Sequence, residues 1–409
     1  MTWSVFALCR IAIPAAVTSL ILALPLSKAA LAQTEEIKIG AIVPSSGPFA
    51  EWGRTNTVAL KMLEEEVNAA GGVNDAKVRI IVTDDQAKPA QAANALRQLA
   101  GDEQVLAIAG PLTSSACEVT FPVANQLEVT STSQASSKPG VAAKNRPWAF
   151  RNTIDEAVLA KTSVPFFKKT FNISSVALIY DAKDAVSTAI STKIMPAVMK
   201  ENGIEVLNAA SPLSFNTGEL DVSAQITALK AFNPSGVVIG ADYSQAITVL
   251  REMKRQGLTV PVIGGTPLIS SAILKAAPEI PVVAPATFYA TMPQERAKAF
   301  VSKLTPRLRA APGLPAGIEP SMYDANIYEI VQIYLDAIKQ AKITPSAANL
   351  AANRVKIRDQ LVALKDFPGL AGPISFQPSG DAAKAFYIVL GKNGAWETME
   401  KGCSGGSAC

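Results

Sequence analysis

From Ile37 onward, short apolar runs alternate with segments whose apolar residues recur at helical spacing. Runs that are apolar on both faces and separated by helices are typical of parallel sheets with helices on both sides. The strands expected from these runs cover residues 37–43, 78–84, 105–110, 129–132, 175–181, 204–210, 235–241 and 260–265. The helices expected between them include 50–70, 89–100, 155–169 and 184–202. The pattern predicts an α/β protein with two clusters of four βα units.

Two changes in pattern suggest how these clusters are arranged. The stretch 139–147, which begins and ends with Pro, is the clearest break between the clusters, and a strand and an Asp-capped helix start follow it. After residue 282 the pattern gives two long helices, over 323–341 and 346–364, and a terminal pair of strands, over 372–376 and 385–390. We expect these late elements to pack onto sheets already formed, so that the chain crosses between two lobes more than once.

The N-terminal segment has the pattern of a secretory signal peptide. Arg10 precedes an apolar stretch over residues 11–26, and Ala30-Leu31-Ala32 supplies small residues at a cleavage site. An uncleaved membrane anchor is the alternative, but the stretch is shorter than the roughly 20 residues that a spanning helix needs. We expect residues 1–32 to be removed before Gln33, leaving a mature protein outside the cytoplasm.

Charge and composition exclude several classes of protein. Of the 409 residues, 49% are hydrophobic and 18% charged, which is an ordinary globular balance. Removing residues 1–32 removes Arg10 and Lys28 and no acid, so 38 − 2 = 36 basic residues remain against 34 acidic ones. The basic residues form no stripe, and nucleic acid is therefore not an expected partner.

The four cysteines suggest one structural bond and no metal site. Cys9 leaves with the signal peptide, and Cys117 falls on an expected helix, where a buried free thiol is the simplest interpretation. Cys403 and Cys409 flank a short Gly/Ser segment, and an oxidising compartment favours a disulfide between them.

The sequence argues against an enzyme. It contains no histidine, which removes Ser-His-Asp and Cys-His machinery and HExxH zinc sites. It also lacks an SxxK motif, the GxGxxG dinucleotide fingerprint and the GxxxxGK[ST] phosphate loop. We therefore expect no catalytic residues, no cofactor and no metal.

Two hydroxyl-rich loops point to ligand binding instead. "GPLTSSAC", residues 110–117, follows one expected strand, and "TSTSQASS", residues 130–137, follows the next. At the carboxyl ends of parallel strands such loops lie on the same rim, where hydroxyls and helix N-termini accept carboxylates. The alternative is that Thr113, Ser114 and Ser115 only cap the following helix.

Several segments of the chain resemble segments of a known protein family. Six segments carry the resemblance, over residues 37–75, 84–100, 110–116, 130–137, 320–338 and 372–396. Together and in this order, the chain resembles the periplasmic solute-binding proteins of branched-chain amino-acid-type ABC transporters over essentially its whole mature length. The resemblance implies two doubly wound parallel-sheet lobes joined by a three-crossover hinge, the type I periplasmic binding protein fold. Lobe one would be 35–152 plus 290–368, lobe two 153–289 plus 369–400, and 401–409 a Cys/Gly/Ser tail.

The resemblance also implies ligand-binding residues in lobe one. Trp52 falls where the family places an aromatic ring against the ligand. Ser114 and Ser115 fall on the carboxylate-binding serine loop. Ala135 and Ser136 fall on the loop that binds the head group of an amino acid.

In lobe two the chain departs from the family. Asp242 and Tyr243 align with a ligand-facing segment, but Thr266 stands where amino-acid binders carry an acid for the ammonium. Asp184 lies in the loop where an aromatic residue is often found. The carboxylate-binding half therefore looks intact and the ammonium-binding half altered, unless Asp242 replaces the missing acid.

These features imply an exported, monomeric substrate-binding protein of an ABC importer, located in the periplasm. It would capture a small carboxylate, either an aromatic or aliphatic organic acid or a neutral branched-chain-type amino acid, and deliver it to a membrane permease. The alternative is a ligand-sensing receptor for amides or organic acids that acts through a separate signalling partner.

Overall fold

The structure is a computed structural model and describes residues 36–392 and 394–405. The expected signal peptide and Cys409 lie outside these residues. Among the helices in the described ranges, none is long and apolar enough to cross a membrane.

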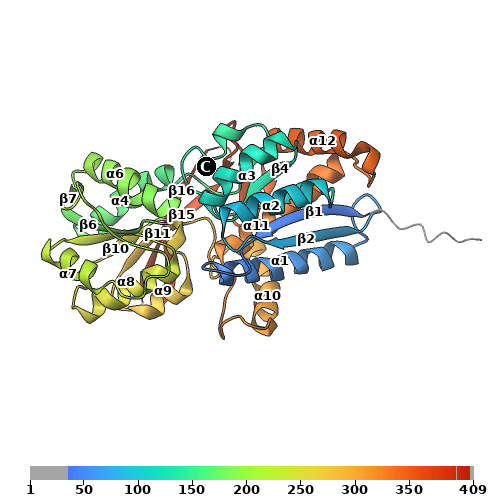
Figure 1. Ribbon diagram of the computed structural model, residues 1–409. Helices are drawn as coiled ribbons and strands as arrows, with labels where there is room; N and C mark the ends of the chain where they lie inside the picture. The colour runs from blue at the N-terminus through green and yellow to red at the C-terminus, as the bar shows by residue number, and fades with distance from the viewer. Residues whose placement is uncertain (1–35, 393, 406–409) are drawn as a thin grey trace, which may run out of the picture. The chain divides into compact units, whose positions relative to one another are not determined.

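The first sheet has five parallel strands in the order β2-β1-β3-β4-β5. They are β1 (Ile37–Val43), β2 (Val78–Asp84), β3 (Ala107–Ala109), β4 (Thr130–Ser133) and β5 (Ala149–Arg151). Helices α1 (Ala50–Ala69) and α11 (Met322–Gln340) cover one face, and α2 (Pro89–Gly101) and α3 (Ser114–Gln126) the other (Figure 1). Ile39 packs in the cluster with α1 and α11, whereas Ile42 packs with α2 and α3. Both faces are buried, as the apolar runs predict.

The second sheet has the order β16-β15-β11-β10-β9-β6-β7, with β8 also paired to β6. Its parallel strands are β6 (Ser175–Asp181), β7 (Glu205–Val206), β8 (Leu213–Phe215), β9 (Gly236–Gly240), β10 (Val262–Gly264) and β11 (Val282–Ala286). β15 (Ala385–Lys392) runs antiparallel to β11 and to β16 (Ala395–Cys403). Figure 1 shows α4 (Glu156–Phe171) and α6 (Met195–Glu201) on one face, and α7 (Ser223–Ala231), α8 (Tyr243–Arg255) and α9 (Ser271–Ala276) on the other.

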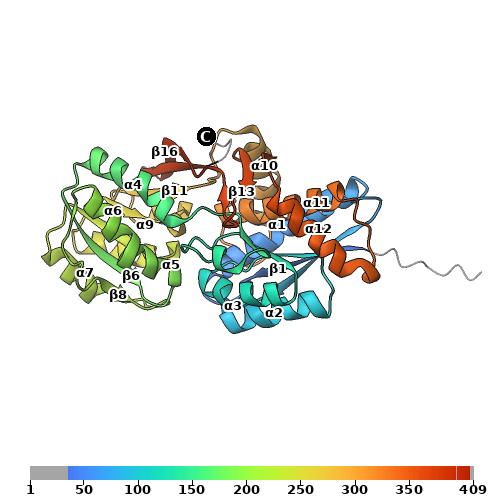
Figure 2. The same cartoon turned by 90° about the horizontal axis from the view of Figure 1, so that it is seen from above.

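The late part of the chain adds to both sheets. Helices α10 (Glu295–Ala310) and α12 (Leu350–Val362) contact α1 and α11, respectively. A three-stranded sheet contains β12 (Phe367–Pro368), β13 (Pro373–Phe376) and β14 (Ala382–Ala383). The expected pairing of the two terminal strands is wrong, because β13 pairs with β12 and β14, while β15 forms its hairpin with β16. Figure 2 shows β13 apart from β16.

Three further sequence expectations need correction. The break at 139–147 does not separate the sheets, because β5 follows it and still belongs to the first sheet. The helix expected over 184–202 is divided into α5 (Ala185–Ala189), a π-helical turn (Ile190–Ile194) and α6. The strand expected over 204–210 shrinks to β7, since only two of its residues pair with β6. The bounds predicted for the two lobes remain a prediction.

Buried polar residues hold the segments that pass between the sheets. Arg151, at the end of β5, is buried and forms ion pairs with Asp381 and, at 3.3 Å, with Asp155. The Lys384 ammonium lies 2.9 Å from a Glu329 carboxylate oxygen and donates to the Asn152 side chain at 3.3 Å. These contacts join the segment after β5, the segment before β15 and helix α11.

Candidate functional site

A cavity of about 30 Å³ lies among loops that follow the carboxyl ends of strands in both sheets. Its lining consists of Phe49, Trp52, Leu112, Thr113, Ser114, Ala135, Asp184, Val186, Asp242, Pro267 and Tyr323. Carboxyl ends of parallel strands are where α/β proteins bind ligands. We take this cavity, called the inner cavity below, as the candidate site.

The first sheet contributes a helix N-terminus and hydroxyl groups. Thr113 is the N-cap of α3, and its side chain accepts a hydrogen bond from the Ala116 N–H at 3.2 Å. Ser114, the first residue of α3, has its hydroxyl 3.0 Å from that of Ser136 and accepts from the Lys138 N–H at 3.4 Å. The partial positive charge of a helix N-terminus favours an anion here.

The two hydroxyl-rich loops are joined by their own side chains. The Ser131 hydroxyl donates to the Gly110 carbonyl, and the Ser133 hydroxyl to the Pro111 carbonyl, each at 2.7 Å. Ser133 also accepts from the Ser136 N–H at 3.0 Å. Because β3 and β4 are parallel neighbours, both loops leave the sheet at the same edge, as the sequence predicts.

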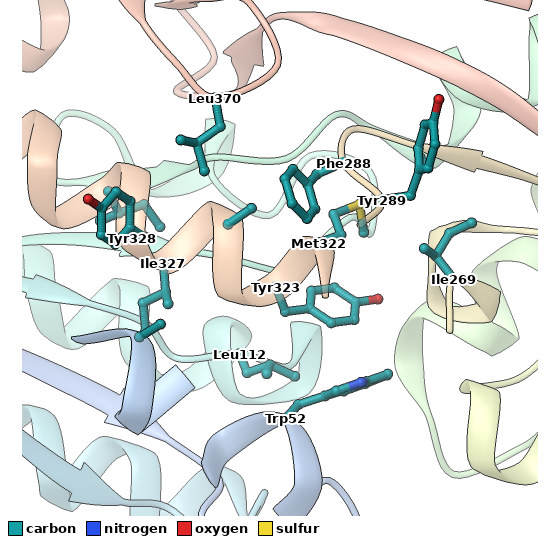
Figure 3. Close-up of a cluster of buried hydrophobic side chains, with 14 of the residues drawn as sticks. Trp52, Leu112, Ile269, Phe288, Tyr289, Met322, Tyr323, Ile327, Tyr328 and Leu370 are labelled. Atoms are coloured by element: carbon teal, nitrogen blue, oxygen red, sulfur yellow. The ribbon is translucent and has the colours of Figure 1, made fainter. Parts of the chain in front are cut away.

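Trp52 forms an aromatic wall at the inner cavity. Its ring centroid lies 4.4 Å from that of Tyr323, 5.1 Å from Tyr243 and 5.5 Å from Phe49. Figure 3 shows the Tyr323 ring beside Trp52, with Leu112 close to both. Trp52 belongs to α1 and Tyr243 to α8, so this contact connects the helices of the two sheets.

The second sheet contributes two carboxylates. Asp242 is the N-cap of α8 and accepts from the Ser244 N–H at 2.7 Å and the Ser244 hydroxyl at 2.6 Å. Burial, with a smaller contribution from the charge of Asp184, raises the pKa of Asp242 to about 6. Asp184 caps α5 in the same way through Ser187, and burial raises its pKa also. No Lys or Arg is among the described residues that line the inner cavity.

A third acid, besides Asp242 and Asp184, is buried and binds Thr266. Glu156, the buried first residue of α4, accepts hydrogen bonds from the Thr266 N–H at 3.0 Å and from the Thr266 hydroxyl. Burial raises the pKa of Glu156 to about 7. The Tyr323 hydroxyl donates to the Thr266 carbonyl at 3.5 Å. Thr266 therefore binds the carboxyl group of Glu156 through hydrogen bonds. Thr266 itself stands at the position where the resemblance implies an acidic residue in amino-acid binders.

Some of the residues predicted from the sequence line the inner cavity, and the others lie next to its lining or farther along the same elements. Trp52, Ser114, Ala135 and Asp242 line it. Ser136 and Tyr243 contact lining residues, Thr266 lies beside the lining residue Pro267, and Ser115 is half-buried on the first turn of α3.

Asp184 and Glu156 are acids whose role the sequence did not reveal. A carboxylate at a helix start has the same pattern whether it caps the helix or faces a cavity. Cys117 is a free, buried thiol, as expected, and burial raises its pKa to about 12. Cys403 takes part in a disulfide, and its predicted pairing with Cys409 stays a prediction. The described residues hold no group of His, Cys, Asp or Glu side chains suited to a metal ion.

Comparison with known proteins gives a consistent result. A family model described as "Periplasmic binding protein" matches residues 36–395. The chain is 25% identical to "Leu/Ile/Val-binding protein BraC3" of Rhizobium johnstonii over 350 residues, which covers 85% of this chain and 89% of that protein. For two other curated relatives, at 25% and 26% identity, the chain spans 59% and 61% of the relative's length.

Two solved structures share the fold. One is the branched-chain amino acid transporter substrate-binding protein LivJ of Streptococcus pneumoniae in complex with isoleucine, with a TM-score of 0.78 and 24% identity over 90% of this chain and 99% of that one. The other is a solute-binding protein of an ABC transporter from R. palustris in complex with benzoate, with a TM-score of 0.77 and 14% identity over 91% and 98%. Both similarities concern the fold.

Proposed function

Because this chain belongs to the periplasmic binding protein family, we propose that it is an exported substrate-binding protein of an ABC importer. It captures a small solute between two lobes and delivers it to a membrane permease. The lobes are those predicted above, and the segments held by Arg151 and Lys384 serve as parts of the hinge. The inner cavity supports this proposal, since its lining comes from the loops of both sheets.

The solute is an amino acid. The observation that carries this conclusion is the composition of the inner cavity, which has a helix N-terminus and the Ser114 hydroxyl on one side and Asp184 and Asp242 on the other. The first group suits a carboxylate and the second an ammonium. An organic acid without an amino group would meet two carboxylates and no basic side chain, which is unfavourable at short range.

The size of the inner cavity requires a conformational change for binding. About 30 Å³ is far below the roughly 300–1,000 Å³ of small-molecule sites. An amino acid fits only if the Trp52–Tyr243 contact opens. A hinge motion that separates the two lobes would open it. In this proposal, the arrangement in which the Trp52 and Tyr243 rings are in contact is the closed one.

Thermal unfolding of the mature protein with paired ligands tests the proposal. Leucine and its 2-oxo acid share a carboxylate and a side chain, and they differ in the ammonium. The full panel contains the standard amino acids, their 2-oxo acids and benzoate. A ligand at about 100 times its Kd stabilises the folded state by about 2.7 kcal/mol.

We expect the melting temperature to rise with at least one amino acid and to stay unchanged with its 2-oxo acid. Shifts with benzoate or 2-oxo acids alone would contradict the amino-acid assignment, and no shift at all would contradict solute binding.

A further inference from the structure

A second, larger cavity adjoins the inner one. Its volume is about 630 Å³, and we call it the lysine groove. One wall comes from α3 and the segment 138–145, and the other from the segment 182–194. Its lining consists of Glu118, Lys138, Pro139, Val141, Lys144, Asn145, Ala182, Lys183, Asp184, Ala185, Thr188, Ala189, Lys193 and Ile194. The two sheets thus contribute to it from opposite sides, as they do to the inner cavity.

The lysine groove and the inner cavity are neighbours at two points. Asp184 lines both of them. Lys138 lines the groove, and its backbone N–H donates to the hydroxyl of Ser114, which lines the inner cavity. A solute with its head group between Ser114 and Asp184 therefore has the groove directly beside it.

The charge of the lysine groove is opposite to that of the inner cavity. Four lysines face two acids, and one of these lysines, Lys138, forms an ion pair with Glu118. Lys144, Lys183 and Lys193 are exposed, and no ion pair is found for them within the described part of the chain. Walls of one sign raise the local concentration of ions of the other sign.

We propose that the lysine groove receives a carboxylate carried by the solute's side chain, so that an acidic amino acid binds more tightly than its uncharged amide. This inference rests on the proposed function. The inner cavity, at about 30 Å³, has no room for a side chain even when its opening admits the head group, and the atoms beyond the head group need adjoining space. The groove provides that space, since its volume lies in the range of small-molecule sites.

Another cavity that shares a lining residue with the inner cavity does not favour an anion. A cavity of about 290 Å³ also has Trp52 in its lining. Its basic residues, Arg251 and Lys275, are outnumbered by Glu51, Glu319 and Asp324. Of these two neighbouring cavities, as the described residues line them, only the lysine groove has an excess of positive charge.

The expected effect is modest because exposed lysines act through water. Three unit charges at about 10 Å from a carboxylate favour it about fivefold at about 10 mM ionic strength. At 1 M salt, where the screening length is about 3 Å, the preference falls to about one. Glutamate and glutamine have nearly the same shape, so the ratio of their dissociation constants isolates the charge.

Isothermal titration calorimetry with glutamate and glutamine at both salt concentrations tests the inference. The variant K144Q/K183Q/K193Q removes the three free charges, and K161Q/K169Q/K200Q removes three exposed lysines outside the cavities described above. We expect glutamate to bind about five times more tightly than glutamine to the wild type and the second variant at low salt, and about equally to the first. A ratio of one in the wild type, or an unchanged ratio in the first variant, overturns the inference. So does binding of leucine without binding of glutamate, whereas failure of every amino acid overturns the proposed function itself.

Discussion

Replacement of Asp242 by asparagine separates the role of its charge from its role as a helix cap. The Asn side chain has nearly the same shape, and its oxygen can still accept the Ser244 N–H. The charge available to a ligand ammonium is lost. A hydrogen bond to a charged partner contributes about 1.5–3 kcal/mol, so D242N should weaken amino-acid binding about 10- to 150-fold.

The pKa of Asp242 adds a pH dependence with a definite sign. With a pKa of about 6, the carboxylate is ionised at pH 7 and largely protonated at pH 5. An ammonium that needs the ionised form should bind about tenfold less tightly at pH 5, and D242N should lose this dependence. A solute that binds as a carboxylate without an ammonium should show the opposite trend, because protonation removes the repulsion.

The same pKa shift predicts a gain in stability for the variant without ligand. The folded-state pKa lies above the unfolded value near 3.8, so the folded protein holds the proton more firmly and loses stability as the pH rises from about 4 to 6. At pH 7 D242N should raise the free energy of unfolding by about 1–3 kcal/mol. An acid that lowers stability while improving binding is consistent with a functional site.

Calorimetry with leucine and its 2-oxo acid at pH 5 and 7, together with urea unfolding, measures all three effects. Asp221 offers a matched control, because its carboxylate accepts the Ser223 N–H at 2.9 Å in the same local pattern but is exposed and outside the inner cavity. D221N should leave affinity unchanged. The reasoning is refuted if leucine binds D242N as tightly as the wild type, or if the pH dependence persists in the variant.

Three other substitutions test the site and its support. S114A should weaken amino-acid binding about 10- to 150-fold in calorimetry, because the ligand carboxylate would lose a hydrogen bond, and unchanged affinity would exclude the hydroxyl from binding. Glu156 has a pKa raised to about 7, so the folded state loses stability from about pH 4.5 to 7. E156Q should therefore raise the free energy of unfolding at pH 8 by about 1–3 kcal/mol, and pH-dependent melting identical to wild type would contradict this expectation. K384M breaks the buried ion pair with Glu329 and should lower the free energy of unfolding, measured in urea, by about 3–5 kcal/mol. The double variant K384M/E329M should recover part of this loss. A loss below about 1 kcal/mol would show that the buried Glu329 carboxylate costs little without its partner.

Local sequence patterns predict the early elements well and the long-range pairings poorly. β1 and β2 have the predicted bounds, and α1 differs by one residue, because their apolar periodicity is strong and uninterrupted. The hairpin partner of β15 was predicted wrongly, because β16 is largely exposed and has no apolar run that marks it as a strand. The pairing of β15 with β11, which joins residues about a hundred positions apart along the chain, was not predicted at all. The π-helical turn before α6 was also missed, and in the structure Ser191 of this turn lies close to Gly240 of β9.

The same limit applies to the site. Trp52, Ser114, Ala135 and Asp242 were predicted from the family pattern, and the structure places all four at the inner cavity. Asp184 follows a strand of the second sheet, as Asp242 does, but only the order β9-β6 brings the two loops to the same edge. A single sequence does not contain that adjacency.

The contact of the Trp52 ring with the rings of Tyr243 and Tyr323 also has a kinetic consequence. An amino acid bound as proposed leaves the inner cavity only when the Trp52–Tyr243 contact opens. Its residence time is then set by the rate at which the two halves separate, and the strength of its own polar contacts acts only by slowing that separation. Solutes of different affinity would show dissociation rates with a common upper limit, equal to the opening rate of the empty protein. A permease that pulls the two halves apart would raise that limit without touching the solute.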